Sequence, residues 1–315
     1  MQDSAPGAPK AASLYYALAW LAGRLPRPLA ALAAGAGAWL IHRRNGRSAC
    51  VARCNVELVA PGAGPAERER LVRGILRGTL LNTLDTLRFW THAPHANLRR
   101  HVRAVHGEAL YAAALADSRG LIVAAPHYGN WELLNQYLAD RAPISIVYAA
   151  PESATGDAFL RRVRGGQPTV SQVRAEPAAV RALWRTLAAG GQAGILPDQQ
   201  PKRGEGAFAP FFGRQALTMT LLTKLAARTG ATVLFGYAER NADGSYDIHF
   251  EAADPALAGD DDDAALAALN AGVERIARRD IRQYQWTYKR FSIVPADDPA
   301  GNPYWPQCYP NRRKR

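Results

Sequence analysis

The sequence predicts an α/β protein in which a mostly parallel central sheet flanked by helices follows an N-terminal membrane-associated helical segment. From about residue 104 onward, short β-branched apolar runs alternate with stretches of helical periodicity, as in a parallel sheet covered by helices. Before that point, helical periodicity dominates. The 315 residues, of which 48% are hydrophobic and 21% charged, are enough to form one large core.

The order of these patterns divides the chain into four segments. Residues 1–12 are expected to be a disordered leader, and residues 13–100 a helical, membrane-associated lead-in. Residues 101–295 form the predicted α/β domain. Residues 296–315 form a basic C-terminal tail, whose last five residues either contact phospholipid headgroups or remain a solvated tail.

The most apolar part of the chain lies near its start. Two apolar runs, Ser13–Gly23 and Leu29–Ile41, are separated by a short segment with two prolines and two arginines. Neither run reaches the roughly 20 residues that a membrane-spanning helix needs. We interpret them as a helical hairpin lying at the membrane interface, with Trp20 and Trp39 near the headgroups. The alternative is a buried helix pair that packs on the core.

Helical patterns continue from Pro65, a natural helix start, to Trp90. In the α/β domain, strands are predicted at Leu121–Ala125, Ile144–Tyr148, Ala193–Leu196, Thr232–Phe235 and Tyr246–Phe250. Further helices are predicted at Pro177–Ala189, Leu217–Arg228 and Ala264–Arg279. Asp260 to Asp263 precede the last of these helices, so we interpret them as a favourable helix N-terminus and not as a calcium loop.

Charge and cysteine content limit the possible partners. The formal net charge of +12 indicates an anionic partner. No helix-turn-helix, RNA-recognition or zinc-finger pattern is present, so nucleic acid is a poor candidate. The cysteines, Cys50, Cys54 and Cys308, are too few and too widely spaced for a zinc site. An odd number without a disulfide framework fits a reducing compartment such as the cytoplasm. We assign no metal.

A candidate catalytic site follows the first buried strand. Pro126 ends the strand, His127 lies in the loop after it, and Asn130 is a suitable N-cap for a helix that begins at Trp131. This is the edge of an open α/β sheet where ligands usually bind. His127 is the predicted general base, and Glu132 the carboxylate that orients it. The plain alternative is a loop histidine beside an ordinary helix N-terminal charge.

Four blocks of sequence, in order, resemble those of a known family. They are His127–Glu132, Ile195–Pro201 with its Asp-Gln pair, Phe208–Gly213 with its Phe-Phe-Gly, and Tyr284–Phe291. Together they resemble the bacterial lipid A biosynthesis acyltransferases, the lauroyl/myristoyl transferases of the wider lysophospholipid acyltransferase group. The resemblance covers roughly residues 13–295.

This resemblance implies an acyltransferase that moves a fatty acyl chain from acyl carrier protein to a hydroxyl of a Kdo-bearing lipid A precursor. Members are held at the bacterial inner membrane with catalysis on the cytoplasmic face. No cofactor is expected, because the thioester donor supplies the driving force. Two alternatives stay open: an acyltransferase acting on another lipid, such as a lysophospholipid, a mannoside or an aminolipid, and a non-catalytic membrane-binding protein.

The resemblance also suggests residues that support the site. The family has an arginine near its active site, which we assign first to Arg164 and second to Arg162. The arginines clustered here would also suit phosphate recognition. A solvated helix face is an equal alternative. Asp198 and Gln199, after a buried strand, are expected to support the active site. The oxyanion is expected to bind Arg164 or backbone N–H groups near Gly129 and Asn130.

Substrate contacts are expected from the loop that follows Gln199. Lys202 and Arg203 lie in a Gly-rich loop able to meet a phosphorylated sugar. Phe208, Phe211 and Phe212 are expected to line a groove for the acyl chain, with packing beneath a loop as the alternative.

Overall fold

The computed structural model describes residues 10–148, 153–164, 168–174 and 177–309. The first helices are α1 Lys10–Gly23, α2 Arg27–Arg43, α3 Arg47–Val59, α4 Pro65–Thr91, α5 Pro94–His101 and α6 Glu108–Ala116. The later ones are α7 Trp131–Arg141, α8 Ala154–Arg164, α9 Pro177–Ala188, α10 Leu221–Thr229 and α11 Asp262–Arg279, with 3₁₀ turns η1 Pro255–Ala258 and η2 Ile281–Gln283. The strands are β1 Val102–His106, β2 Leu121–Ala124, β3 Ile144–Tyr148, β4 Val170–Arg174, β5 Gln192–Ile195, β6 Gly206–Phe211, β7 Arg214–Met219, β8 Thr232–Arg240 and β9 Tyr246–Ala252.

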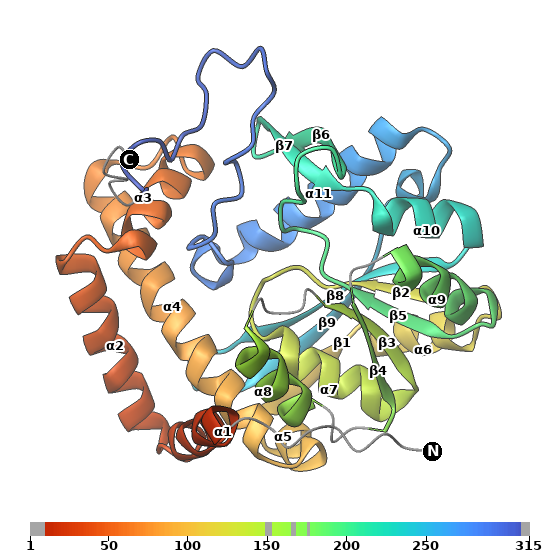
Figure 1. Cartoon of the computed structure of the whole chain (residues 1–315), viewed down its shortest axis with the longest axis horizontal. Coiled ribbons are helices and arrows are strands. Elements are labelled where there is room, and N and C mark those ends of the chain that lie inside the picture. Colours follow the sequence, from red (N-terminus) through yellow and green to blue (C-terminus); the bar gives the residue numbers. More distant parts are fainter. Residues whose placement is uncertain (1–9, 149–152, 165–167, 175–176, 310–315) are drawn as a thin grey trace.

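The predicted mixed fold with a mostly parallel sheet is confirmed. Within the described residues, seven strands form a sheet in the order β1-β9-β8-β2-β5-β3-β4. Neighbouring strands are parallel except β8 and β9, which form an antiparallel pair, so β1 and β9 run against the other five. Strand β2, which leads into the loop of His127, lies between β8 and β5 at the centre of the sheet (Figure 1). The β6–β7 hairpin forms a separate two-stranded sheet.

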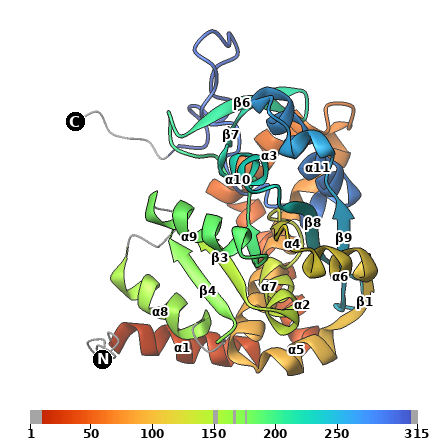
Figure 2. The same ribbon diagram turned by 90° about the vertical axis from the view of Figure 1, so that its right-hand side faces the viewer.

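Helices cover both faces of the sheet, because alternate residues of each strand face opposite sides. Ile122 and Ala124 of β2 belong to a core shared with α9, α10 and α11. Leu121 and Val123 belong to a second core shared with α6 and α7. All four residues are buried, which explains the unbroken apolar run in the sequence. The hairpin of β6 and β7 lies beyond one end of the sheet, beside α10 and α11 (Figure 2).

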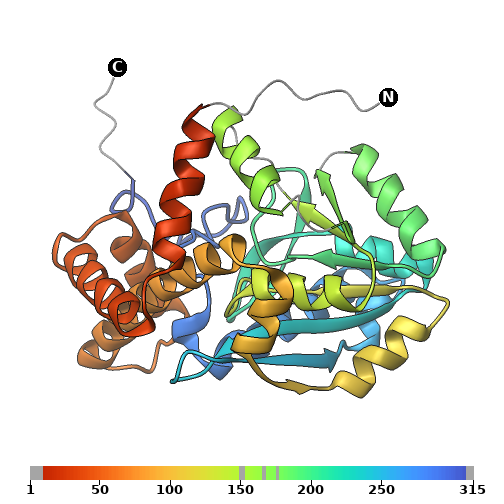
Figure 3. The same cartoon turned by 90° about the horizontal axis from the view of Figure 1, so that it is seen from below.

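The four N-terminal helices gather on one side of the sheet, where α4 packs against α1, α2 and α3 (Figure 1). Helix α1 also lies beside α8 (Figure 3). The outer faces of α1 and α2 expose large apolar side chains: Leu14, Tyr15, Leu18, Trp20, Leu21, Leu29, Leu32, Trp39 and Leu40. Among the helices that the structure describes, none combines the length and apolar character needed to cross a membrane. Of the predicted leader, Lys10 begins α1, and residues 1–9 lie outside the described residues.

Several predicted boundaries need correction. The helix predicted from Leu217 begins at Leu221, because residues up to Met219 form β7. The strand predicted to end at Phe235 continues to Arg240, since it pairs with β9 along its whole length. Strands β1, β4 and β6 were not predicted. The helix start at Pro65 and the aspartate-rich start of α11, where Asp261 caps the helix, are confirmed.

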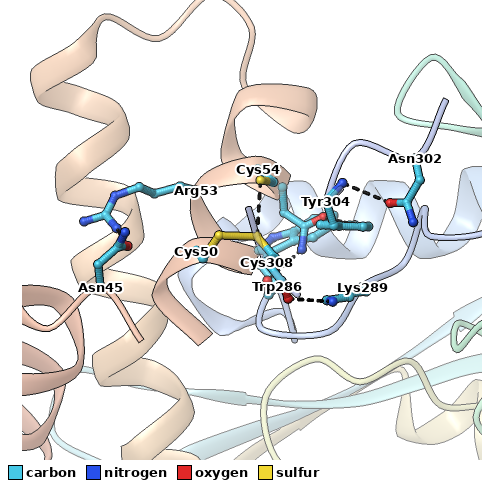
Figure 4. Close-up of a disulfide and its surroundings, with 10 residues drawn as sticks. Asn45, Cys50, Arg53, Cys54, Trp286, Lys289, Asn302, Tyr304 and Cys308 are labelled. Atoms are coloured by element: carbon cyan, nitrogen blue, oxygen red, sulfur yellow. Dashed lines mark hydrogen bonds between the residues drawn. A yellow bond between two sulfur atoms is a disulfide. The ribbon is translucent and has the colours of Figure 1, made fainter. Parts of the chain in front are cut away.

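A disulfide contradicts the expectation of a chain without one. Cys50 on α3 is bonded to Cys308 near the C-terminus, and the free thiol of Cys54 lies 3.6 Å from the Cys308 sulfur (Figure 4). Beside them, the Asn55 side chain donates to the carbonyl oxygen of Trp286 at 2.7 Å and accepts from the Tyr304 hydroxyl at 2.6 Å. Tyr304 and Cys308, near the end of the described chain, are therefore held against α3.

Candidate active site

The loop between β2 and α7 carries His127, and its far end is fixed by Asn130. The Asn130 side chain accepts a hydrogen bond from the Leu133 backbone N–H at 3.1 Å, which confirms the predicted N-cap. Its amide nitrogen donates to Asn82 Oδ1 at 2.6 Å and to Thr86 Oγ1 at 3.1 Å, both on α4. Asn130 is completely buried, and these hydrogen bonds tie the loop of His127 to α4.

Backbone hydrogen bonds hold this loop between β8 and the segment after η2. The N–H of Gly129 donates to the Gln283 carbonyl at 3.1 Å, and that of Asn130 donates to the Ala238 carbonyl at 2.9 Å. The Gln285 N–H donates to the His127 carbonyl at 3.0 Å. The expectation that the N–H groups of Gly129 and Asn130 bind an oxyanion is therefore wrong for this conformation, because both already have acceptors.

Gly129 is required at its position, and we expect Gly129→Ala to destabilise the protein by at least about 3 kcal/mol. Its φ is +59°, and a Cβ there would overlap the carbonyl oxygen of Ala238. Gly230→Ala is the matched control, since Gly230 has a φ of +68° with open space around it. That variant is expected to cost only the conformational strain, about 1–2 kcal/mol. Urea denaturation of both variants checks the difference, and equal losses would contradict it.

His127 is held by Asp198, not by Glu132 as predicted. Asp198 Oδ1 accepts from His127 Nδ1 at 2.8 Å, and its Oδ2 accepts from the His127 backbone N–H at 2.8 Å. Burial alone would raise the pKa of Asp198, but the charge of His127 and the hydrogen bonds from it lower that pKa below its usual value. The buried carboxylate thus stays ionised and fixes the proton of the imidazole on Nδ1.

The second ring nitrogen of His127 faces Gln199. The Gln199 side-chain nitrogen lies 3.1 Å from His127 Nε2 and 3.1 Å from Gln285 Oε1. An amide nitrogen has two hydrogens, and Gln285 Oε1 accepts one of them. The other is directed at the Nε2 lone pair, which is free because Nδ1 carries the ring proton. Gln199 therefore occupies the position that an acceptor hydroxyl must take.

Glu132 forms a different pair. Its carboxylate accepts from Arg164 Nε at 3.1 Å and also from a terminal nitrogen of the same guanidinium. Burial raises the pKa of Glu132, and the charge of Arg164 partly opposes this increase. The guanidinium lies 4.9 Å from the centre of the Trp131 indole, and that indole lies 6.3 Å from the His127 ring. Arg164 thus packs on Trp131, and its guanidinium is engaged by a carboxylate and not free for phosphate.

A cavity of about 100 Å³ opens beside His127. Its wall is formed by α4, the loop of His127, the start of α7, and η2 with the residues after it. The lining residues are Gly78, Thr79, Asn82, Thr83, His127, Trp131, Arg282, Gln283, Tyr284 and Gln285. Most of these groups are polar. The cavity therefore suits a hydrated hydroxyl-bearing group next to the imidazole.

The remaining predicted site residues lie elsewhere. Lys202 and Arg203 are exposed in the loop between β5 and β6. Arg162 lies over the Tyr16 ring, 4.0 Å from its centre, where α8 meets α1. None of the three lines the cavity beside His127.

The prediction that the phenylalanines of the Phe-Phe-Gly block line an acyl-chain groove needs correction. Phe211 and Phe212 are buried in the core, with Phe212 packed edge-on against Trp286 at 5.3 Å and Phe211 near Phe291 at 6.0 Å. Phe208 is half-buried on β6. These rings do not line the cavity of His127, and packing beneath the loop explains Phe211 and Phe212.

Three functional neighbours were missed: Asn82, Gln283 and Gln285. The side chain of Gln283 accepts from the Arg240 N–H at 2.8 Å and donates to the Arg240 carbonyl at 3.0 Å, so it completes the ladder at the end of β8. Amide side chains leave no periodic signal in a sequence. Only the position of Gln285 within the Tyr284–Phe291 block pointed toward the site.

A buried carboxylate, an oriented histidine and an adjoining polar cavity at the end of a central parallel strand form the arrangement that general-base catalysis requires. The chain belongs to the bacterial lipid A biosynthesis acyltransferases, whose family model matches residues 6–292. It is 26% identical over 287 residues to a lipid A biosynthesis palmitoleoyltransferase of Escherichia coli (strain K12), a match that covers 89% of this chain and 90% of the relative. A lipid A biosynthesis acyltransferase of Shigella flexneri matches to the same extent. The protein is therefore an enzyme of the acyltransferase class.

Proposed function

We propose that the protein transfers a fatty acyl chain from acyl carrier protein to a hydroxyl of a Kdo-bearing lipid A precursor. The observation that carries the proposal is the His127–Asp198 pair beside a polar cavity, in a chain of the lipid A acyltransferase family. The net charge of +12 supports two acidic partners, a carrier protein and a phosphorylated glycolipid.

In the proposed mechanism, the acceptor hydroxyl displaces the Gln199 amide from His127 Nε2. The imidazole removes the hydroxyl proton as the oxygen attacks the thioester carbonyl, and Asp198 stabilises the imidazolium that forms. The tetrahedral intermediate collapses by breaking the carbon–sulfur bond. The departing thiolate takes the proton back from His127, so the acyl ester and the free thiol are the products.

Glu132 and Arg164 have a different proposed role. Their ion pair is buried, and the guanidinium packs on Trp131, which forms part of the wall around His127. We assign them to holding this wall in place. The geometry supports Asp198 as the orienting carboxylate.

Attachment to the cytoplasmic face of the inner membrane is part of the proposal. The exposed apolar side chains on α1 and α2 include two tryptophans, Trp20 and Trp39, at 41% and 58% exposure. Such a surface suits insertion at the headgroup level of a bilayer.

The test is transfer of a labelled acyl chain from acyl carrier protein to a tetra-acylated, Kdo-bearing precursor. His127→Ala is expected to lower turnover by about 10³-fold or more, because the base is lost. His95→Ala, at an exposed histidine of α5, is the matched control and should retain wild-type turnover. Full turnover in His127→Ala would overturn the assigned base. Label found only on a lysophospholipid or another glycolipid would overturn the assigned acceptor.

A further inference from the structure

A second, larger cavity of about 510 Å³ lies between α2, α4, the turn that joins β8 to β9, and η2. Four arginines stand in its wall, from four different parts of the chain: Arg27, Arg77, Arg240 and Arg282. The wall also contains two aspartates, Asp243 and Asp280. Cationic side chains therefore outnumber anionic ones.

The arginines differ in how far their charge is already balanced. Arg240 Nε donates to Asp85 at 3.1 Å, and Arg282 Nε donates to Asp280 at 2.7 Å. Arg27 instead donates to the carbonyl oxygen of Gly244 at 3.3 Å and contacts His101, and neither of these is an anion.

Arg77 and Asp243 are the remaining charged residues of the cavity wall whose partners matter. Arg77 is exposed and has no carboxylate partner within the part of the chain that the structure describes. The carboxylate of Asp243 accepts from the backbone N–H and the hydroxyl of Ser245, at 2.8 and 2.6 Å. Arg27 lies near the charge of Asp243, but neither Arg27 nor Arg77 has a hydrogen-bonded carboxylate within the described residues, so both guanidinium groups can bind an anionic ligand. Guanidinium groups bind phosphate oxygens in pairs, which makes phosphate the fitting chemistry.

The cavity adjoins the site of His127. Gly78, Arg282 and Gln283 line both cavities. Close packing of η2 on α4 creates this shared wall: a Cβ at Gly74 would lie 2.8 Å from Arg282 Cδ, and one at Gly78 would overlap the Arg282 carbonyl oxygen. A ligand that extends across this shared wall would place one group beside His127 and another beside the arginines.

The surroundings favour a lipid over a small soluble anion. Pro28 and Ala31 of α2 line the cavity, and next to them on the same helix Leu29 and Leu32 are 52% and 70% exposed. A cationic cavity bordered by exposed apolar side chains matches an amphiphile with a phosphorylated headgroup.

We propose that this arginine-lined cavity binds a phosphate group of the acceptor lipid and so positions the acceptor hydroxyl at His127. This inference rests on the proposed function, and it moves phosphate recognition away from Arg164, Lys202 and Arg203. The carrier protein has no part in it.

The first experiment compares acceptor lipid with and without its phosphate groups. Arg77→Gln is the informative variant, since Arg77 is exposed and unpaired within the described chain. We expect its KM for the phosphorylated acceptor to rise about tenfold with little change in kcat, because one charge-assisted contact is lost. Its KM for the dephosphorylated acceptor should equal that of the wild type. Arg70→Gln is the matched control: it is exposed on the same helix, about 10 Å along the axis from Arg77.

The inference would be overturned if Arg77→Gln changed the KM equally for both acceptors. It would also be overturned if the wild type had the same KM for the phosphorylated and the dephosphorylated acceptor. An equal effect in Arg70→Gln would overturn it as well.

The second experiment measures binding without turnover, so that it stands even if no transfer is found. Vesicles carrying the phosphorylated acceptor are titrated with wild type, Arg77→Gln and the double variant Arg27→Gln/Arg77→Gln. Binding that weakens stepwise in the variants supports the cavity whatever the reaction proves to be. Inorganic pyrophosphate, measured by calorimetry, is expected to bind much more weakly than the vesicles. Equal affinity for both would overturn the assignment to a lipid.

Discussion

Asp198→Asn is expected to lower kcat by about 10³–10⁴-fold, a loss of the size known for the carboxylate of histidine-based catalytic sites. An asparagine keeps the size of the side chain but carries no charge to stabilise the imidazolium. Its amide group also donates, which favours the wrong tautomer of His127. The loss should appear in kcat for acyl transfer, while the circular dichroism spectrum and the KM for the acceptor stay near their wild-type values.

The comparison with Glu132→Gln makes this prediction specific. If Asp198 orients His127, Glu132→Gln should retain far more turnover than Asp198→Asn. The reverse order would restore Glu132 to the orienting role that the sequence suggested.

Arg164→Gln is expected to destabilise the protein by about 3–5 kcal/mol, because it leaves the buried carboxylate of Glu132 without its charged partner. The side chains of Glu132 and Arg164 are only 6% and 15% exposed. Removing the guanidinium removes the largest of the interactions that lower the pKa of Glu132, so burial will raise that pKa further. Urea denaturation near neutral pH measures the loss.

Two further variants test whether the loss of stability comes from leaving a buried charge unpaired and not from removing any arginine. Arg141→Gln breaks an exposed ion pair with Glu108 and should cost less than about 1 kcal/mol. The double variant Glu132→Gln/Arg164→Gln should recover part of the stability, since the unpaired charge is gone. A double variant as unstable as the sum of the single ones would show that the two side chains are not coupled.

Local signals in the sequence were sufficient for elements marked by a β-branched run or by a proline in the first helical turn. Strand β3 was predicted at its observed bounds, and helix α4 at its observed start, because a β-branched run and a proline at a first helical turn act locally. Strands β6 and β7 were missed because their stability comes from pairing with each other and from packing against α11. The hairpin pairing is local, but the packing against α11 depends on residues far apart in the chain.

The same limit explains the error at the site. Glu132 is five positions from His127, and the resemblance to the family drew attention to both. Asp198 is 71 positions away and reaches His127 only because β2 and β5 are neighbours in the sheet. From the sequence, His127 and Asp198 were both predicted to follow buried strands. The order of those strands in the sheet could not be predicted, and that order decides which carboxylate contacts the imidazole.

The bond between Cys50 and Cys308 changes the chain from a line into a ring. Residues 50 to 308, which include the whole sheet and every residue assigned to the reaction, form one closed covalent loop of sequence separation 258. Helices α1 and α2 precede this covalent loop in the sequence and are not part of it. A single backbone cut anywhere within this loop therefore leaves the two fragments joined by the disulfide. Helices α1 and α2, with their exposed apolar side chains, then stay covalently linked to His127 and Asp198.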